Sequence, residues 1–421
     1  MLLLHVSDIH FRKGFAGSDI DPERLLRHEL KLDVQTMCER LGAVDAILVS
    51  GDIAFAGDPE EFEFATRWLD ELCIVSGAKS SEVFTCPGNH DAVRTIAGGP
   101  VVSALHDKIK RTENEYIDAL LKQYLDDPAS AKLLYSPLSN YNNFAAQFGC
   151  SVSAPDRLIA TRDLYLNDSS ILRLHGFNSA LVSSANDKKD DLFVDPNCLQ
   201  ILREPGVEHL VMCHHPPEWL RNGQRLSDHL SDVAKVQLFG HEHLHRIRRD
   251  VDYLRIAAAA THPDRTEPGW EPGYNFLELS VRGAGADRWL STKTHVRLWQ
   301  SNPARFRAKV DRNEESVFSH EIKLPRWEGV EQDGAAQQPA PLPTTGGEAM
   351  ASLREVNRRF FKLTVSQRAA IAGRLGLLQA EDADQPDYER YERVFMRARE
   401  RELIEQLEME VQVAEEQKSG G

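Results

Sequence analysis

The sequence has few of the features that stabilise secreted proteins or hold a chain in a membrane. Its six cysteines lie far apart, at positions 38, 73, 86, 150, 198 and 213, and none forms a CxxC pair. No run of about 18 apolar residues could span a bilayer. The apolar opening MLLLHVSDIH lacks the basic lead of a signal peptide. We therefore expect reduced thiols, no membrane segment and a cytoplasmic protein.

Positive charge is also scarce. The chain has 50 Lys and Arg against 65 Asp and Glu, a formal net charge of −15, and no long basic run. This balance does not favour broad electrostatic capture of nucleic acid, although it is compatible with a local basic groove. The sequence has no P-loop and no serine-nucleophile motif, so its chemistry must come from other residues.

The sequence does have short apolar runs that end in polar residues able to bind metal. The runs and the letters that follow them are Leu2 to Val6 with SDIH, Ala46 to Val49 with SGD, Val83 to Thr85 with CPGNHD, Leu210 to Cys213 with HHPP, and Val236 to Phe239 with GHEH. A sixth run, Ile171 to Phe177, has no such ending. The pattern predicts buried strands of an α/β fold. Functional side chains would lie beyond the carboxyl ends of these strands.

Seven side chains in these endings are candidate metal ligands: Asp8, His10, Asp52, Asn89, His214, His241 and His243. They offer carboxylates, imidazoles and one amide but no thiolate. We expect Mn²⁺ first, with Fe²⁺, Zn²⁺ or Mg²⁺ as alternatives. Seven ligands are too many for one tetrahedral ion and suit two ions that share Asp52. Two ions about 3.5–4 Å apart can hold a hydroxide that attacks phosphorus.

The motifs DIH, GDIAFAG, GNHD, HHP and GHEH resemble, in content and order, those of the calcineurin-like metallophosphoesterases, specifically their bacterial phosphodiesterase-like branch. The resemblance covers roughly residues 1 to 300. It implies an α/β fold of four layers, with two packed mixed sheets flanked by helices. It also implies two ligand sets that share Asp52: Asp8, His10 and His243 for one metal, and Asn89, His214 and His241 for the other.

The same resemblance gives His90 a catalytic role. His90 would stabilise or protonate the leaving-group oxygen, and Asp91 would orient its ring. Arg12 and Arg94 follow ligand motifs and would pair with a substrate phosphate, unless they are solvent-exposed charges. His215 would line the pocket or face away, with His214 as the ligand. The loop THPDR, with His262 and Arg265, is expected at the pocket rim.

The chain divides into three parts by composition. We expect a catalytic domain over residues 1–326 with a helical insertion at about 102–148, a flexible linker over 327–350, and a helical domain over 351–417. Within the first part, a helix is expected from Pro22 to Leu41. The apolar candidates of that helix are Leu25, Leu26, Leu32 and Val34.

The last part contains a capping box from Thr364 to Gln367, followed by apolar residues at helical spacing. Its segments FFKLTVSQRAAIAGRLGLL and YERVFMRARERELIEQL resemble the small death-like or effector-associated adaptor domains of bacterial conflict proteins. The resemblance implies a protein partner for this part of the chain. The alternative is a helical packing or dimerisation element.

These expectations point to a metal-dependent phosphodiesterase that acts on a nucleotide or a nucleic acid. One alternative is a DNA or RNA nuclease that serves as the effector of an anti-phage system. An alternative of another class is a metal-binding scaffold without catalysis, although every expected ligand is present. The sequence does not determine the oligomeric state.

Overall fold

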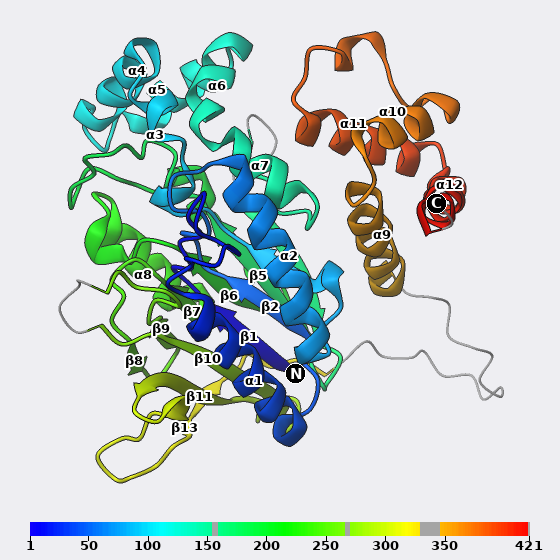
Figure 1. Cartoon of the computed structure of the whole chain (residues 1–421). Helices are drawn as coiled ribbons and strands as arrows, with labels where there is room; N and C mark the ends of the chain where they lie inside the picture. The colour runs from blue at the N-terminus through cyan, green and yellow to red at the C-terminus, as the bar shows by residue number, and fades with distance from the viewer. Residues whose placement is uncertain (154–158, 266–269, 329–345, 420–421) are drawn as a thin grey trace.

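Two β-sheets form the centre of the larger part of the molecule (Figure 1). The computed structural model describes residues 1–153, 159–265, 270–328 and 346–419. The strands of the first sheet, in spatial order, are β12 (Ala304–Ala308), β11 (Trp289–Ser301), β10 (Gly273–Arg282), β1 (Leu2–Val6), β2 (Ala46–Val49) and β3 (Val83–Thr85), and β13 (Phe318–Lys323) also pairs with β11. The strands of the second sheet are β4 (Ile159–Tyr165), β5 (Ile171–Phe177), β6 (Val207–Cys213), β7 (Ala234–Phe239), β9 (Leu254–Ala257) and β8 (Arg246–Arg249).

Both sheets are mixed. In the first sheet β1, β2 and β3 run parallel, whereas β10 to β13 join by antiparallel pairing. In the second sheet β5, β6, β7 and β9 run parallel, and β4 and β8 are antiparallel edge strands. The six runs predicted as strands all belong to these two parallel groups, with β3 at the edge of the first sheet. The carboxyl ends of the parallel strands open on one side of the molecule.

One apolar core joins the two sheets. Leu4 and Leu48 of the first sheet and Leu174 and Leu238 of the second belong to the same buried cluster, and none of the four is exposed to solvent. The helices α1 (Arg24–Leu41) and α2 (Pro59–Ser76) cover the first sheet, and α8 (Gly223–Val233) packs on the second (Figure 1). This arrangement confirms the predicted four-layer α/β fold.

Helix α1 begins and ends close to the predicted bounds, but its buried face differs from the prediction. Leu26, Leu30 and Val34 are buried, whereas Leu25 and Leu32 are exposed. Positions 26, 30 and 34 are four residues apart and share one face of a helix, while 25 and 32 point elsewhere. Leu25 and Leu32 were therefore wrongly assigned to the core.

The segment between β3 and β4 is helical, as expected for the insertion. It contains α3 (Arg94–Ala97), α4 (Pro100–Arg111), α5 (Ile117–Leu125), α6 (Pro128–Tyr135) and α7 (Ser139–Ala146). The last of these helices returns to the catalytic loops. Asn140 of α7 donates to the backbone carbonyl of Gly57 at 2.8 Å, and Val93 N donates to the carbonyl of Pro137 at the same distance. The helical segment is thus tied to the loops that follow β2 and β3.

The C-terminal part is all-helical and has a core of its own. Its helices are α9 (Gly346–Phe361), α10 (Val365–Arg374), α11 (Asp387–Glu400) and α12 (Ile404–Ser419). Phe360, Tyr391 and Leu407 lie at the centre of its apolar cluster. The predicted capping box is present, because Thr364 and Gln367 bond to each other's backbone. Most of the predicted linker, 329–345, lies outside the described residues, and the proposed domain boundaries remain predictions. No helix within the described ranges is long and apolar enough to cross a membrane.

Two basic residues of α9 and one directly after its end, spaced four apart, contact the catalytic part. Arg354 pairs with Glu82 at 2.8 Å, Arg358 with Asp70 at 2.8 Å, and Lys362 also with Asp70 at 3.2 Å. Arg358 is 1% exposed, so its charge is almost completely removed from water. This spacing places the three cations on one face of the helix, and that face is occupied by the catalytic part.

Helix α7 lies beneath this contact. Asn357 of α9 donates to the carbonyl of Ala146 at 2.9 Å, and the backbone N–H of Tyr388 in α11 donates to the side-chain oxygen of Asn143 at 3.3 Å. The same short helix therefore contacts the C-terminal domain on one side and the Gly57 loop on the other.

Candidate metal centre

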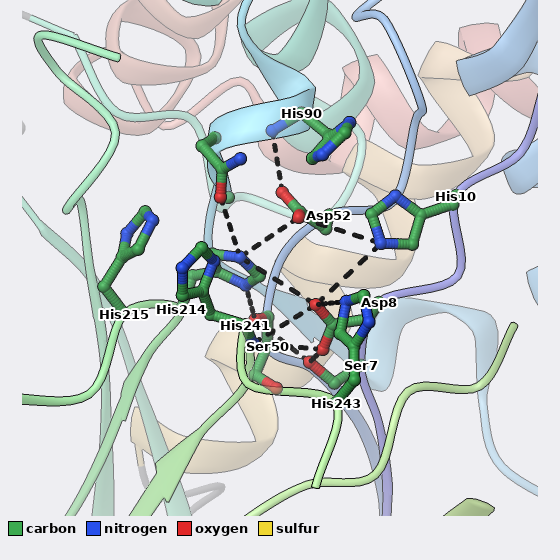
Figure 2. A network of polar contacts seen from close by, with 12 residues as sticks. Ser7, Asp8, His10, Ser50, Asp52, His90, His214, His215, His241 and His243 are labelled. Carbon is green, nitrogen blue, oxygen red and sulfur yellow. Dashed lines mark hydrogen bonds and ion pairs between the residues drawn. The ribbon is translucent and has the colours of Figure 1, made fainter. Parts of the chain in front are cut away.

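All seven predicted ligands meet at the carboxyl ends of parallel strands. Figure 2 labels six of them, and the seventh, Asn89, has its Oδ1 3.2 Å from His214 Nε2. Asp8 and His10 follow β1, and Asp52 follows β2. Asn89 lies in the turn after β3, His214 follows β6, and His241 and His243 follow β7. The two sheets thus contribute to one site, which no single run of the sequence could form.

The distances between ligand atoms are short. His243 Nε2 lies 3.3 Å from Asp8 Oδ1, and His214 Nε2 lies 3.2 Å from Asp52 Oδ2. His10 Nε2 lies 3.8 Å from the same Asp52 oxygen. Asp52 Oδ2 therefore lies between the side chains of His10 and His214. The other oxygen, Oδ1, accepts the backbone N–H of His90 at 2.8 Å.

Five of these residues have an unusual backbone. The φ angles of Asp8, His10, Asp52, His241 and His243 are 51°, 52°, 51°, 69° and 56°. Residues other than glycine rarely adopt positive φ, because the side chain then crowds the backbone. Such conformations persist where the surrounding structure enforces them, and they cluster at functional sites.

Two glycines make room for the site. A side chain at Gly240 would meet Asp8 Oδ2 at 2.9 Å and His214 Nδ1 at 3.0 Å. A side chain at Gly88 would collide with the carboxylate and the backbone nitrogen of Asp52. The glycines of GHEH and GNHD are therefore required for the close approach of the loops that carry the ligands.

The electrostatics of the centre favour positive charge beside Asp52. Burial alone would raise the pKa of Asp52, but the charge and the hydrogen bond of His214 hold it well below its ordinary value. Against the effect of burial, the carboxylate of Asp52 raises the pKa of His214 to about 9. Burial lowers the pKa of His10 to about 3 and that of His241 to about 4, so both rings are neutral at pH 7 and able to bind a cation.

These residues fit divalent metal ions. Among the described residues, four groups of three side chains have ligand atoms within 4.8 Å of one another: Asp8, His10 and His243; Asp8, Asp52 and His214; His10, Asp52 and His90; and His214, His215 and His241. The first group is the set predicted for one metal. Both ring nitrogens of His10 are buried, and neither makes a hydrogen bond to a described residue. A donor set of carboxylates and imidazoles with an unused ring suits Mn²⁺, Fe²⁺ or Zn²⁺.

Asp91 was predicted to orient the ring of His90, but a backbone group holds that ring instead. His90 Nδ1 lies 2.7 Å from the carbonyl oxygen of Phe55, which can only accept a hydrogen bond. The carboxylate of Asp91 accepts the backbone N–H groups of Ile53 at 2.9 Å and Ala54 at 2.8 Å, and that of Gly88 at 2.9 Å. The orienting role of Asp91 was therefore wrong: this residue joins the β2 loop to the GNHD turn.

The predicted substrate-binding residues lie around the same centre. Arg94 Nη2 lies 2.8 Å from His90 Nδ1. Arg12 lies over the ring of Phe55, 4.1 Å from its centroid, and pairs with Asp264 at 3.0 Å. His215 is fully buried, and its Nδ1 lies 2.8 Å from the hydroxyl of Ser179.

Sequence reasoning missed several groups that support the site. The backbone carbonyl of Ser50 lies 2.9 Å from His214 Nδ1, so the ring presents Nε2 to the centre. The ring of Trp219 packs edge-on against His241, with centroids 4.2 Å apart. The SGD motif gave a signal for Ser50, because this residue directly precedes the loop of Asp52. There was no signal in the sequence for the Phe55 carbonyl, because every residue has a backbone carbonyl and the residue type does not reveal its role.

Comparisons with known proteins agree with this geometry. A family model described as calcineurin-like phosphoesterase matches residues 1–245, and one described as GTPase-associated adaptor domain matches residues 352–412. The chain is 25% identical over 266 residues to the glycerophosphodiester phosphodiesterase GpdQ of Enterobacter lignolyticus (strain SCF1). The aligned region covers 62% of this chain and 71% of that protein.

Similar solved structures include Vps29 from Entamoeba histolytica complexed with zinc, at 12% identity and a TM-score of 0.30, covering 77% of this chain and 99% of that chain. Another is GAP50, the anchor in the inner membrane complex of Plasmodium, at 13% identity and a TM-score of 0.38. The match covers 78% of this chain and 90% of that chain. The family model over residues 1–245 spans more than half of the 421 residues, and the chain therefore belongs to the calcineurin-like phosphoesterase family.

Proposed function

We propose that this phosphoester hydrolase is a phosphodiesterase that works with two divalent cations, Mn²⁺ first among them. The observation that carries the proposal is the position of Asp52 Oδ2, 3.2 Å from His214 Nε2 and 3.8 Å from His10 Nε2. One carboxylate oxygen there is shared by two groups of ligands, as a site for two ions requires.

The proposal divides the ligands as the family resemblance does. Asp8, His10 and His243 would hold one ion, and Asn89, His214 and His241 the other, with Asp52 between them. Two such ions, when bound, lower the pKa of water and neutralise charge on the phosphoryl oxygens. The protein supplies the positions of these side chains and the burial that strengthens their interactions with charge.

His90 is the proposed proton donor to the leaving group. Two groups meet His90 Nδ1: the Phe55 carbonyl at 2.7 Å, which can only accept, and Arg94 Nη2 at 2.8 Å, which can only donate. Nδ1 can bond to only one of them, and we propose the shorter contact with Phe55, which keeps one proton on that nitrogen. A second proton, on Nε2, is then the one that can be transferred. The ring lies against His10, with centroids 4.6 Å apart, which places it at the edge of the metal centre.

The identity of the phosphoester substrate is a further part of the proposal. Sequence reasoning predicted a nucleotide or a nucleic acid, whereas the name of the GpdQ relative refers to glycerophosphodiesters. Nucleic acids, cyclic nucleotides and glycerophosphodiesters are all phosphodiesters, and on this shared chemistry we propose a preference for diesters over monoesters. The cytoplasmic location remains a prediction from the cysteine pattern.

Hydrolysis of bis(p-nitrophenyl) phosphate with Mn²⁺ tests this function, with p-nitrophenyl phosphate as the monoester comparison. We expect the diester to be preferred, and Asp52→Asn and His90→Ala each to lower kcat at least about 100-fold. Elemental analysis should find two ions per wild-type chain and fewer in Asp52→Asn. Preference for the monoester would contradict the phosphodiesterase, and no turnover by any of the three proteins would favour the scaffold.

For the C-terminal domain we propose a protein partner, because the matching family model is described as an adaptor. The test is affinity capture from cell extract with the full chain and with a chain that ends at Pro325. A partner retained only by the full chain supports the proposal. Equal capture by both would contradict it.

A further inference from the structure

A small cavity of about 160 Å³ opens beside the metal centre, with His10 in its wall. The loops that form the rest of the wall are residues 12–16 after β1, residues 21–27 at the start of α1, and residues 262–265. The last loop reaches the centre because Thr261 N donates to the carbonyl of Ser7 at 2.8 Å and His262 N to that of Asp8 at 3.1 Å. A diester bound at the metal centre has a second ester arm, and an arm that extends past His10 enters this cavity.

The charges that line the cavity are paired. Arg12 contacts Asp264 at 3.0 Å, and Arg265 contacts Glu23 at 3.0 Å. Arg27 forms a buried ion pair with Asp21. With three cations matched by three carboxylates, the wall offers no net charge to attract a second phosphate. The carboxylate oxygens still have lone pairs that can accept hydrogen bonds from hydroxyl groups.

His262 provides a polar atom without a partner. This residue is 4% exposed, and its Nδ1 lies 2.7 Å from the carbonyl oxygen of Ile9. The carbonyl can only accept, so Nδ1 carries the proton and Nε2 is an acceptor. His262 Nε2 is buried and has no hydrogen-bond partner among the described residues. Buried acceptors are normally satisfied, and a ligand hydroxyl in the cavity would satisfy this one.

Resting on the proposed phosphodiesterase function, we propose that this cavity binds the second ester arm of the substrate, and that the arm is a small, uncharged polyol such as a glyceryl group. The cavity, at about 160 Å³, is smaller than the 300–1,000 Å³ typical of sites for drug-sized ligands, so we expect it to favour a small arm over a nucleoside. Its paired charges disfavour the neighbouring phosphate of a nucleic acid. The unpartnered acceptor His262 Nε2 favours a hydroxyl group.

The test compares three p-nitrophenyl phosphodiesters that differ only in the second arm: methyl, glyceryl and 5′-thymidyl. The released p-nitrophenol is the same in each case, so differences in kcat/KM report the second arm. We expect the glyceryl diester to exceed the methyl diester by at least about tenfold, because the arm gains hydrogen bonds to buried acceptors. The thymidyl diester should be no better than the methyl diester.

Two variants locate the effect in the cavity. Ala16→Met places a longer side chain in the wall and should remove the glyceryl advantage while leaving the methyl diester unchanged. His262→Phe removes the acceptor in a ring of similar shape and should lower the same advantage. Ile20→Met is the matched control, since Ile20 is 72% exposed and lies in the same segment outside the cavity wall.

Equal kcat/KM for the glyceryl and methyl diesters would overturn the polyol arm, as would a preference for thymidyl. A glyceryl advantage that survives in Ala16→Met would show that the arm binds elsewhere. In each of these results the diesters are still hydrolysed, so the phosphodiesterase stands. If none of the three diesters were hydrolysed, the proposed phosphodiesterase function would be contradicted, and with it the proposed binding of the second ester arm.

Discussion

The side-chain amide of Asn140 donates to the backbone carbonyl of Gly57 at 2.8 Å. Gly57 lies two residues after Phe55, whose carbonyl lies 2.7 Å from the ring of His90. A helix of the insertion therefore holds the loop that positions the proposed proton donor. This relationship connects the structure around the cleft to the chemistry within it.

Loss of this hydrogen bond should lower turnover. We expect Asn140→Ala to reduce kcat on bis(p-nitrophenyl) phosphate by about fivefold, with KM little changed, because one hydrogen bond of roughly 1 kcal/mol no longer holds the loop. Steady-state kinetics measure the effect, and circular dichroism verifies folding. The control is Ser139→Ala, whose hydroxyl donates to the carbonyl of Ser136 within the same segment. A kcat equal to wild type would show that the loop keeps its position without Asn140.

The structural role of Asp91 predicts a loss of stability. Its carboxylate accepts three backbone N–H groups, and Asp91→Asn replaces one acceptor oxygen with a donor. We expect the free energy of unfolding to fall by about 3 kcal/mol, measured by urea denaturation. Well below the melting temperature, kcat should fall less in this variant than in His90→Ala. The opposite order would restore the orienting role that the sequence first indicated.

The contact between α9 and the catalytic part depends on Arg358. We expect Arg358→Ala to destabilise the chain by about 2 kcal/mol, because it leaves Asp70 with the more exposed Lys362 as its ionic partner. Hydrogen exchange should increase in both α7 and α9. Lys362→Ala is the control: its side chain is 43% exposed, and surface ion pairs contribute little. Unchanged exchange in α7 would show that the two helices are not coupled.

A buried carboxyl group should make stability depend on pH. Burial raises the pKa of Glu208 to about 7 from an ordinary 4.5, despite the nearby Arg288. The folded chain thus binds this proton more tightly than the unfolded chain. The resulting stabilisation is complete below pH 4.5 and is lost as pH rises through 7.

Glu208→Gln cannot ionise and should avoid this loss. We expect its unfolding free energy, relative to wild type, to rise by about 2 kcal/mol between pH 5 and pH 8. Urea denaturation at both pH values measures the difference. The comparison variant is Glu204→Gln, whose carboxylate pairs with Arg173 near the surface. A constant difference between Glu208→Gln and wild type would mean that Glu208 is already ionised at pH 5.

Sequence reasoning selected candidate metal ligands that lie near one another in the structure because these residues follow strands. The ends of neighbouring strands meet in space, so residue type and order were enough to bring Asp8, Asp52 and His214 together. The same reasoning failed for β4 (Ile159–Tyr165), which was not predicted although its burial alternates along the strand. Strand β4 is an antiparallel edge strand with several polar residues, and its apolar pattern is weak.

Other features depend on contacts that sequence patterns do not contain. The wrong role of Asp91 followed from its position next to His90, whereas its partners come from residues about 38 positions away and from Gly88. The cavity beside His10 is formed by loops more than 200 residues apart. Its residues His10, Arg12, His262 and Arg265 were anticipated as site residues, but the cavity itself was not. Long-range packing decided both cases.

The basic face of α9 also has a consequence for recruitment. Since Arg354, Arg358 and Lys362 are already engaged with Glu82 and Asp70, a visiting protein must approach the helical module from the side of α10 and α12, or compete with those acids. The first route would hold the bound protein at a fixed distance from the metal centre of the hydrolase. The second route would release the helical domain from the catalytic part. Binding of the partner would then depend on salt concentration, because salt screens the ion pairs that it must replace.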